Sequence, residues 1–345
     1  MRSLLSRAAV WALVALAGGA PLHGQLAPYH VRQTIPIGGE GFWDYLTVDS
    51  ANQRLFVSHG TRVEVVDLVL DTLTAVIPNT PGVHGIAVAD DLGRGFASDG
   101  RDSAVTIFDL RTLTTIDAVN VGAANPDAIV YDPVTHRVFT MNGGGASATA
   151  LDGASGMVAG TVALGGRPEF AVADGRGRIY VNLEDSSTVV AFDARTLQVV
   201  RRWPLAPCEE PSALAMDRAH RRLFSGCANA LMAVSDADAG RVVATLPIGR
   251  GVDAGAFDPA TGFAFASCGA DSVLTIVHED DPDHYRVVAN VPTRRGARTL
   301  ALDPLSHRVY LPVAQFGAEA APTPDRPRPR PSVVPGTFGV LVLER

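Results

Sequence analysis

An aromatic residue recurs seven times in this chain at nearly constant spacing. It falls at Phe56, Phe96, Phe139, Tyr180, Phe224, Phe265 and Tyr310, with successive members 40 to 45 residues apart. A period of this length indicates a repeat architecture, in which each unit packs mainly against its neighbours. The aromatics therefore predict seven units within one domain, although a chain of 345 residues would ordinarily suggest two domains.

The unit around Phe139 shows what each repeat contains. Residues 126–131 and 137–142 are short apolar strands separated by an Asp-Pro turn, and two further strands are expected at 148–151 and 157–164. Four antiparallel strands form the blade of a propeller. The sequence thus predicts an all-β fold, a single seven-bladed β-propeller, and 34 glycines and 23 prolines suit its many tight turns.

The two ends of the chain supply the strands that close the ring. Residues 30–38 have the pattern of a fourth strand with no preceding three, and the last blade ends after its third strand at 338–343. We therefore expect the N-terminal strand to complete the C-terminal blade. This pairing removes open sheet edges, which would otherwise invite aggregation.

The first 24 residues have the layout of a secretory signal peptide. Arg2 and Arg7 precede an apolar run at 8–17, and small and helix-breaking residues follow. We expect residues 1–24 to be removed and residues 25–345 to form the propeller, with a Pro/Arg-rich insertion at 314–335 in the last blade. The protein is expected to be periplasmic or secreted and monomeric, with no membrane span, because no segment offers about 20 apolar residues.

The charge of the chain limits its partners. Losing Arg2 and Arg7 with the leader lowers the net charge from −7 to −9, which disfavours nucleic acid as a partner. The chain contains no lysine, so Schiff-base chemistry through lysine is excluded. A small molecule or an envelope protein is the expected partner.

Two hairpins and several turns resemble a known repeat. Residues 137–142 (RVFTMN) and 178–182 (RIYVN), with the Asp-Pro turns at 132–133, 258–259 and 303–304, are similar to the YVTN-type β-propeller repeat of YncE-like exported proteins. The resemblance extends over the whole mature chain. It implies an exported propeller and assigns no activity.

Antiparallel geometry gathers half of the loops on one face of the ring, which we call the mouth face. It carries the loops between blades and the loops between the second and third strands. Two sets of equivalent positions are expected there. The first set begins the innermost strands and comprises Asp44, His84, Asp127, Glu169, Ser212, Asp253 and Arg298; the second ends the second strands and comprises His59, Asp99, Asn142, Leu183, Cys227, Cys268 and Val313.

These positions predict a ligand site around the channel. The candidate ligand-binding residues are Asp44, His59, His84, Asp99, Asp127, Asn142, Glu169, Glu209, Glu210, Asp253 and Arg298. The candidate metal ligands are Asp44, His84, Asp127, Glu169 and Asp253, for which Ca²⁺ or Mg²⁺ is the expected ion. A cationic or polyhydroxylated ligand suits the same groups, and a merely solvated channel mouth is the alternative.

Cysteines and acidic clusters add two further expectations. Cys208 and Cys227 both reach the mouth face and are expected to form a disulfide, with Cys268 as the rival partner. Residues 278–284 and 236–240 carry metal-competent side chains on the opposite face. We interpret both as solvated hairpin segments and assign them no function.

Three functions remain open from the sequence. The leading hypothesis is a non-catalytic binding propeller that presents its mouth face to a small ligand, a metal ion or an envelope partner. The alternative is a metal-dependent hydrolase or lyase whose cation polarises a carbonyl or activates water. A rigid scaffold is the third. The sequence contains no nucleophile elbow, phosphate-binding loop or zinc-protease motif.

Overall fold

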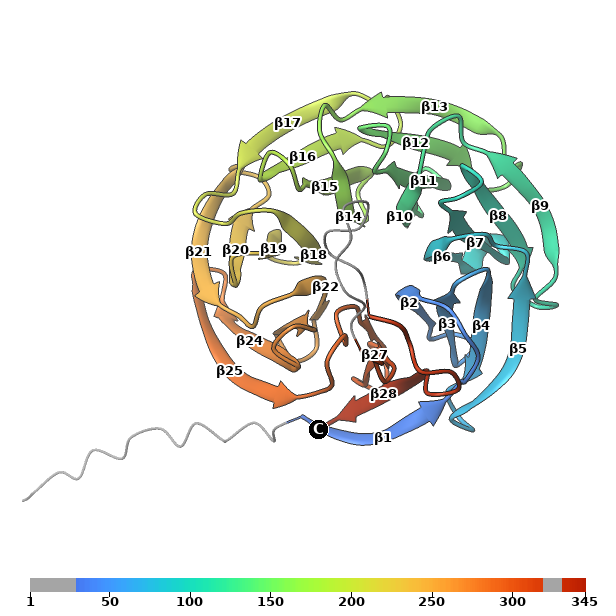
Figure 1. The fold of residues 1–345 in the computed structure, drawn as a ribbon. Helices are drawn as coiled ribbons and strands as arrows, with labels where there is room; N and C mark the ends of the chain where they lie inside the picture. Colours follow the sequence, from blue (N-terminus) through green and yellow to red (C-terminus); the bar gives the residue numbers. More distant parts are fainter. Residues whose placement is uncertain (1–28, 319–330) are drawn as a thin grey trace, which may run out of the picture.

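Seven four-stranded antiparallel sheets form a ring in the computed structural model, which describes residues 29–318 and 331–345 (Figure 1). The predicted seven-bladed β-propeller is confirmed. Each blade runs from an innermost strand beside the channel to an outermost strand on the rim. The predicted signal peptide at 1–24 lies outside the described residues, as does the middle of the 314–335 insertion.

The first four blades follow one another along the chain. Blade 1 comprises β2 (Trp43–Asp49), β3 (Arg54–His59), β4 (Arg62–Asp67) and β5 (Thr72–Pro78). Blade 2 comprises β6 (Val83–Ala89), the 3-10 helix η1 (Asp90–Leu92), β7 (Arg94–Asp99), β8 (Ala104–Asp109) and β9 (Thr115–Asn120). Blade 3 comprises β10 (Pro126–Asp132), β11 (Arg137–Asn142), β12 (Ser147–Asp152) and β13 (Val158–Ala163). Blade 4 comprises β14 (Pro168–Ala173), β15 (Arg178–Leu183), β16 (Thr188–Asp193) and β17 (Val199–Pro204).

The remaining blades complete the ring. Blade 5 comprises β18 (Pro211–Asp217), β19 (Arg222–Cys227), β20 (Leu231–Asp236) and β21 (Arg241–Pro247). Blade 6 comprises β22 (Val252–Asp258), β23 (Phe263–Cys268), β24 (Val273–Asp281) and β25 (His284–Pro292). Blade 7 comprises β26 (Ala301–Leu302), β27 (Val309–Val313), β28 (Gly339–Glu344) and β1 (His30–Pro36).

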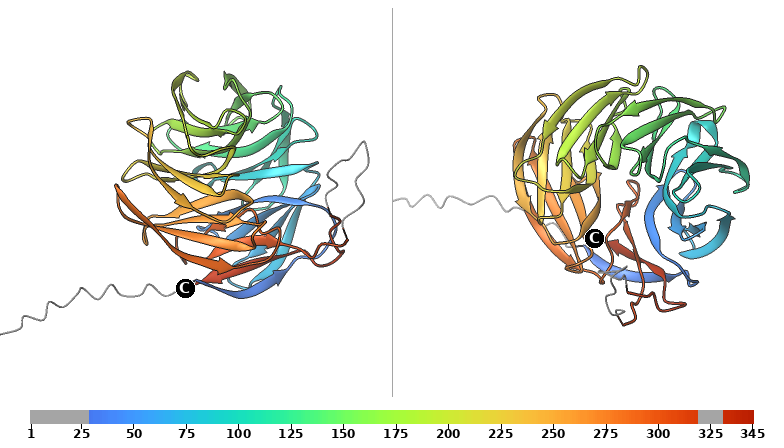
Figure 2. Two further views of the ribbon diagram at one scale, coloured as in Figure 1. Left: turned by 60° about the vertical axis from the view of Figure 1, so that its left-hand side comes forward. Right: turned by 45° about the horizontal axis from the view of Figure 1, so that its top comes forward.

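The ends of the chain close the ring as the sequence predicts. Strand β1 pairs antiparallel with β28, with Ile35 opposite Val340, and the two strands lie side by side in each view (Figure 2). Ile35 is 1% exposed, so the seal buries apolar surface and also pairs backbone groups. Hydrophobic burial and hydrogen bonding together hold the last blade shut.

The recurrent aromatics form the core between blades. All seven are at most 1% exposed. Phe56 on β3 contacts Phe108 on β8 of the next blade, with ring centroids 5.5 Å apart, and Phe139 on β11 contacts Phe192 on β16 of the next blade at 5.4 Å. A single blade has little interior of its own, so most of the apolar burial occurs at these interfaces.

Two aromatic rings from non-adjacent blades meet within the channel. Tyr45 on β2 of blade 1 packs edge to face against Phe170 on β14 of blade 4, with centroids 4.7 Å apart. Tyr45 is 7% exposed, and Phe170 also packs against the cores formed by blades 4 and 5 and by blades 6 and 7. The pair therefore plugs the channel below the mouth face. In the described part of the chain, no helix has the length and apolar character needed to cross a membrane.

Candidate functional site

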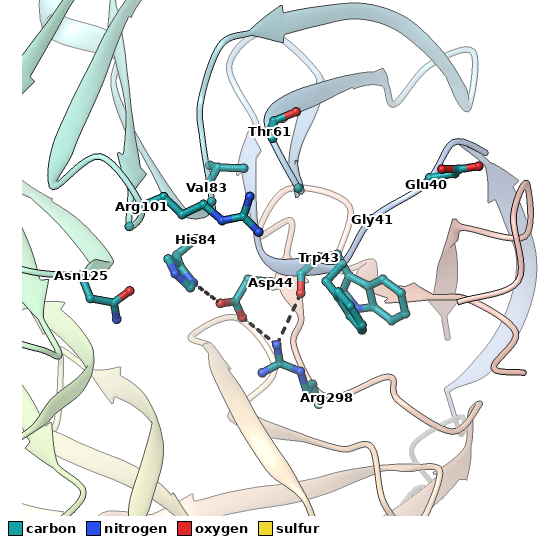
Figure 3. Close-up of a pocket in the computed structure, with 14 residues that line it drawn as sticks. Glu40, Gly41, Trp43, Asp44, Thr61, Val83, His84, Arg101, Asn125 and Arg298 are labelled. Carbon is teal, nitrogen blue, oxygen red and sulfur yellow. Dashed lines mark hydrogen bonds and ion pairs between the residues drawn. The ribbon is translucent and has the colours of Figure 1, made fainter. Parts of the chain in front are cut away.

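The residues that begin the innermost strands converge at the mouth of the channel. The Asp44 carboxylate lies 2.7 Å from Nδ1 of His84, with which it forms a hydrogen bond (Figure 3). The same nitrogen of His84 lies 3.7 Å from Asp127. Arg298 donates to Asp44 at 3.2 Å and forms an ion pair with Asp253. Strands β2, β6, β10 and β22, together with the segment before β26, thus bring five of the predicted positions into one network.

A cavity of about 530 Å³ opens beside this network. Donors and acceptors both line it: Arg101 and His84 lie on one side, and Asn125 and Asp44 complete the polar wall (Figure 3). Phe42, 47% exposed, contributes an aromatic surface. A neighbouring cavity of about 370 Å³ shares Phe42, Trp43 and Arg298 and adds Phe316. Concave sites with a few convergent polar groups and apolar walls are typical of small-molecule binding.

Arg298 organises the acidic groups around it. Besides contacting Asp44 and Asp253, its guanidinium donates to the Trp43 backbone carbonyl at 3.4 Å. A guanidinium presents five donors in a fixed plane, so it can hold several acceptors at once. Asp44 is consequently shared between Arg298 and His84, which fixes the orientation of its carboxylate.

Burial and mutual repulsion raise the pKa of two carboxyl groups at the mouth. Burial raises the pKa of Asp127 to about 6, with Asp44 adding to the shift and His84 opposing it. Burial likewise raises the pKa of Glu169 to about 7, reinforced by Asp127 and Glu184. Arg167 opposes that shift from 3.3 Å. These two groups change protonation near neutral pH.

The pKa of the His84 imidazole is raised as well, which for a base favours the charged form. Burial disfavours its charged form, but the hydrogen bond to Asp44 and the nearby charge of Asp127 outweigh burial and raise the pKa of His84. The pKa of Tyr45, beneath the network, is raised well above its usual value by burial and then by Asp127 and Asp44. The Tyr45 hydroxyl therefore stays protonated and can only donate to these carboxylates.

Only part of the predicted metal set comes together. Asp44, His84 and Asp127 each offer one ligand atom, and these atoms lie within 4.8 Å of one another. Asp253 is instead held by Arg298, and Glu169 lies beside Arg167. A cation at this place would also have to displace the proton that His84 shares with Asp44.

The predicted positions at the ends of the second strands require a correction. His59, Asp99 and Asn142 are at most 1% exposed and lie inside their blades, not on the channel mouth. Each is bonded to the adjacent third strand: His59 to Glu64 at 2.9 Å, Asp99 to Thr106 at 2.6 Å, and Asn142 to Thr149 at 3.0 Å. These side chains act as internal blade contacts.

Glu209 and Glu210 also lie apart from the network. Both are exposed on the segment before β18, where their backbone amides donate to Asn229 and Ser187. Among the described residues, no hydrogen bond or ion pair links either carboxylate to Asp44 or His84. They remain candidate residues only for a partner large enough to cover that part of the face.

Cys208 and Cys227 form a disulfide at the start and end of the β18–β19 hairpin, with Cα atoms 5.7 Å apart. Cys268 is a buried free thiol, and burial raises its pKa to about 11. A thiol of this kind is a poor nucleophile and metal ligand at neutral pH. Cys268 is therefore best understood as a core residue.

Sequence reasoning missed several residues that line the cavity. Thr61 and Arg101 come from equivalent loops of the mouth face, each two residues after the end of a second strand, and Asn125 lies in the loop before β10. Their loops could be assigned to this face from the strand order alone. It also interpreted residues 278–284 as a solvated hairpin, whereas Glu279 of that segment is 7% exposed and forms a second cluster with Asp217 and His220 on the opposite face. Those residues come from two blades and have no common spacing.

Comparison with known proteins supports the fold. No family model matches the chain, and no curated protein matches it. Among solved structures, it is similar to the structure of U3-55K and to the crystal structure of RRP9 WD40 repeats, each with a TM-score of 0.74, 11% identity, and coverage of 90% of this chain and 97% of the other. It is also similar to a chain in the crystal structure of the mitotic checkpoint complex, with a TM-score of 0.72, 15% identity, and coverage of 89% and 96%. At these identities the likeness supports the seven-bladed propeller fold and assigns no function.

Proposed function

We propose that this protein is a non-catalytic binding propeller whose mouth-face cavity holds a small polyhydroxylated ligand. The observation that carries the proposal is the cavity of about 530 Å³ in which fixed donors and acceptors converge beside an aromatic surface. Arg298 and His84 can donate to hydroxyl oxygens, whereas Asn125 and Asp44 can accept from hydroxyl hydrogens. An apolar ring face beside such groups suits the C–H face of a polyol.

Two features support binding over passage or turnover. Tyr45 and Phe170 meet across the channel, which disfavours passage of a molecule through the ring. The network around Arg298 is already paired, so little reorganisation is needed when a ligand binds.

Export to the periplasm or the cell exterior is part of the proposal. The leader pattern of residues 1–24 and the Cys208–Cys227 disulfide support it, because structural disulfides persist in oxidising compartments. Full-length expression in a bacterial host, followed by N-terminal sequencing of the periplasmic fraction, tests this part. Mature protein that begins near residue 25 is expected, and full-length protein confined to the cytoplasm would contradict it.

A metal-dependent hydrolase or lyase is the second candidate. It is favoured by one observation, the three ligand atoms of Asp44, His84 and Asp127 that lie within 4.8 Å of one another. A divalent cation there would polarise a carbonyl or activate water. The pairing of Asp44 with Arg298 disfavours it, because a guanidinium and a metal ion would compete for one carboxylate.

One set of measurements separates the two. The melting temperature is measured for protein that has been freed of metal with a chelator. It is measured again after addition of each member of a panel of sugars and sugar alcohols, and after addition of Ca²⁺ or Mg²⁺. Ligand at one hundred times its dissociation constant raises stability by about 2.7 kcal/mol. We expect stabilisation by a polyol that is abolished in Arg298→Ala and retained in Glu210→Gln, an exposed control on the same face.

Stabilisation that persists in Arg298→Ala would place the ligand elsewhere. Stabilisation by Ca²⁺ or Mg²⁺ alone, lost in Asp127→Asn, would favour the metal-dependent enzyme. No response to any compound in the panel would refute the polyol proposal.

A further inference from the structure

Blade 6 departs from the charge pattern that the other blades share. In six blades an arginine at the start of the second strand lies opposite an acidic residue at the end of the third. The pairs are Arg54 with Asp67, Arg94 with Asp109, Arg137 with Asp152, Arg178 with Asp193, Arg222 with Asp236, and Arg308 with Glu344. In blade 6 the corresponding residues are Phe263 and His278, so the arginine is missing.

The interface between blades 5 and 6 also lacks a cation that two other interfaces have. At two other interfaces the aspartate at the end of an innermost strand faces a basic residue of the next blade: Asp174 meets Arg221 at 3.1 Å, and Asp258 meets His307 at 2.8 Å. In blade 5 the corresponding aspartate is Asp217. The position in blade 6 that would supply its cation is Gly262, which has a positive φ of 69° and no side chain.

An additional carboxylate occupies the place of the missing cations. Strands β24 and β25 are nine residues long, against five to seven for the other second, third and fourth strands, and Glu279 lies on this extended hairpin. Its backbone amide donates to the Gly262 carbonyl at 2.8 Å, which anchors it beside Asp217. Asp217 is 2% exposed and Glu279 is 7% exposed. Two buried acidic side chains therefore face each other, whereas the interfaces between blades 4 and 5 and between blades 6 and 7 pair an acid with a base.

His220 completes the group from the β18–β19 turn. Its Nδ1 lies 2.6 Å from Asp217 and 3.3 Å from Oε1 of Glu279, and one ligand atom from each of the three residues lies within 4.8 Å of the others. Neither oxygen of Glu279 has a hydrogen-bond donor among the described residues. The nearest arginine, Arg222, is committed to the Pro282 carbonyl at 3.0 Å and to Asp236 at 3.2 Å.

We propose that Asp217, His220 and Glu279 form a Zn²⁺ site that joins blades 5 and 6 on the face opposite the channel mouth. Two carboxylate oxygens and one imidazole nitrogen are ligands that Zn²⁺ accepts in tetrahedral sites. The half-exposed His220 leaves the fourth position open to water. The ion supplies the positive charge that Gly262 and Phe263 do not, and it holds the long β24–β25 hairpin against the β18–β19 turn.

The test uses the full mature chain, freed of metal with a chelator and then titrated with Zn²⁺ in competition with a chromophoric chelator. We expect binding of one equivalent with a rise in melting temperature. Both the binding of Zn²⁺ and the rise in melting temperature should be lost in Glu279→Gln and in His220→Asn. The second variant changes a half-exposed side chain, so it leaves the buried pair intact and folds even if the first does not.

Two control variants make the assignment specific. His284→Asn removes an exposed histidine of the same hairpin, and Asp127→Asn alters the cluster at the channel mouth. Both variants should still bind one equivalent of Zn²⁺. Co²⁺ in place of Zn²⁺ should give the visible absorption of a four-coordinate site in the parent and not in His220→Asn.

The competing arrangement is a proton shared between Asp217 and Glu279. It predicts no stoichiometric Zn²⁺ binding and an apo Glu279→Gln protein as stable as the metal-treated parent. That result would overturn the proposal, as would Zn²⁺ binding that survives both His220→Asn and Glu279→Gln.

Discussion

Replacing Asp99 by asparagine should stabilise the protein at neutral and alkaline pH. Asp99 ends β7, is 1% exposed, and accepts one hydrogen bond from Thr106 at 2.6 Å, while its Oδ1 has no partner. Burial raises the pKa of Asp99 to about 7, the nearby Asp102 adds to the shift, and the Thr106 hydrogen bond and His84 oppose it. The ionised form is thus disfavoured in the native state.

The size of the effect follows from the pKa difference. The native pKa of about 7 lies about three units above the ordinary value of 3.8, and each unit corresponds to about 1.4 kcal/mol. Ionisation of Asp99 therefore lowers the unfolding free energy by at most about 4 kcal/mol. A raised carboxyl pKa means that the native state binds more protons than the unfolded state, so the loss builds up from about pH 4 to about pH 7.

Blade 3 shows how asparagine would fit at this position. Asn142 ends the equivalent strand β11, and its amide donates to Thr149 at 3.0 Å and Ser147 at 3.2 Å. Thr149 corresponds to Thr106 in blade 2. Asparagine at position 99 can therefore donate to the Thr106 hydroxyl without changing the strand register.

Urea unfolding of the parent and Asp99→Asn at pH 4, 6 and 8 measures the prediction. The two proteins should be equally stable at pH 4, and the variant should be more stable by at least about 1 kcal/mol at pH 8. Asp109→Asn is the opposite control, because backbone amides of Thr112 and Arg111 lower the pKa of Asp109. The Asp109→Asn substitution should lower the unfolding free energy at pH 8, and by less at acidic pH. A gain in Asp99→Asn that does not vary with pH would refute the reasoning.

Three further outcomes are expected from the fold. Reducing the Cys208–Cys227 disulfide, which spans 19 residues, should lower the unfolding free energy by about 3 kcal/mol in calorimetry with and without reductant. Phe139→Ala should cost about 3 to 5 kcal/mol in urea unfolding because the ring is fully buried, whereas Val134→Ala in the exposed hairpin should change stability by less than about 0.5 kcal/mol. Ile35→Ala should cost about 2 to 5 kcal/mol, and a neutral result would mean that β1 contributes little to the seal.

The repeat and its closure were predictable because they depend on local chemistry that recurs. Phe139 and its six equivalents mark the second strand of every blade, and their burial explains why an aromatic is retained at that position. The unpaired strand pattern at residues 30–38 predicts β1 and its pairing with β28, and this pairing is confirmed. Binary pattern and turn chemistry therefore suffice for strand order.

The positions of single side chains were harder to predict. Asn142 lies three residues beyond Phe139, so strand alternation points it to the other face of the same blade, and in a propeller both faces are covered by neighbouring sheets. Asp99 and His59 are enclosed for the same reason. Glu279 stands at a repeated position at or just after the end of the third strand, and its backbone amide makes the same bond as its equivalents in blades 1 to 5, which are Leu68, Leu110, Gly153, Ala194 and Ala237. An acidic residue at a position that is otherwise apolar or small was the signal for this contact.

The seal between β1 and β28 also has a consequence for how the molecule is made. Arg32 on β1 and Glu344 on β28 are bonded although they lie 312 residues apart in sequence, so six blades can assemble during synthesis while the seventh waits for the last strand. Until then β1 has no partner strand. A β1 strand from a second molecule presents the same backbone pattern, so refolding at high concentration favours reciprocal strand exchange and dimers that dilution alone releases slowly.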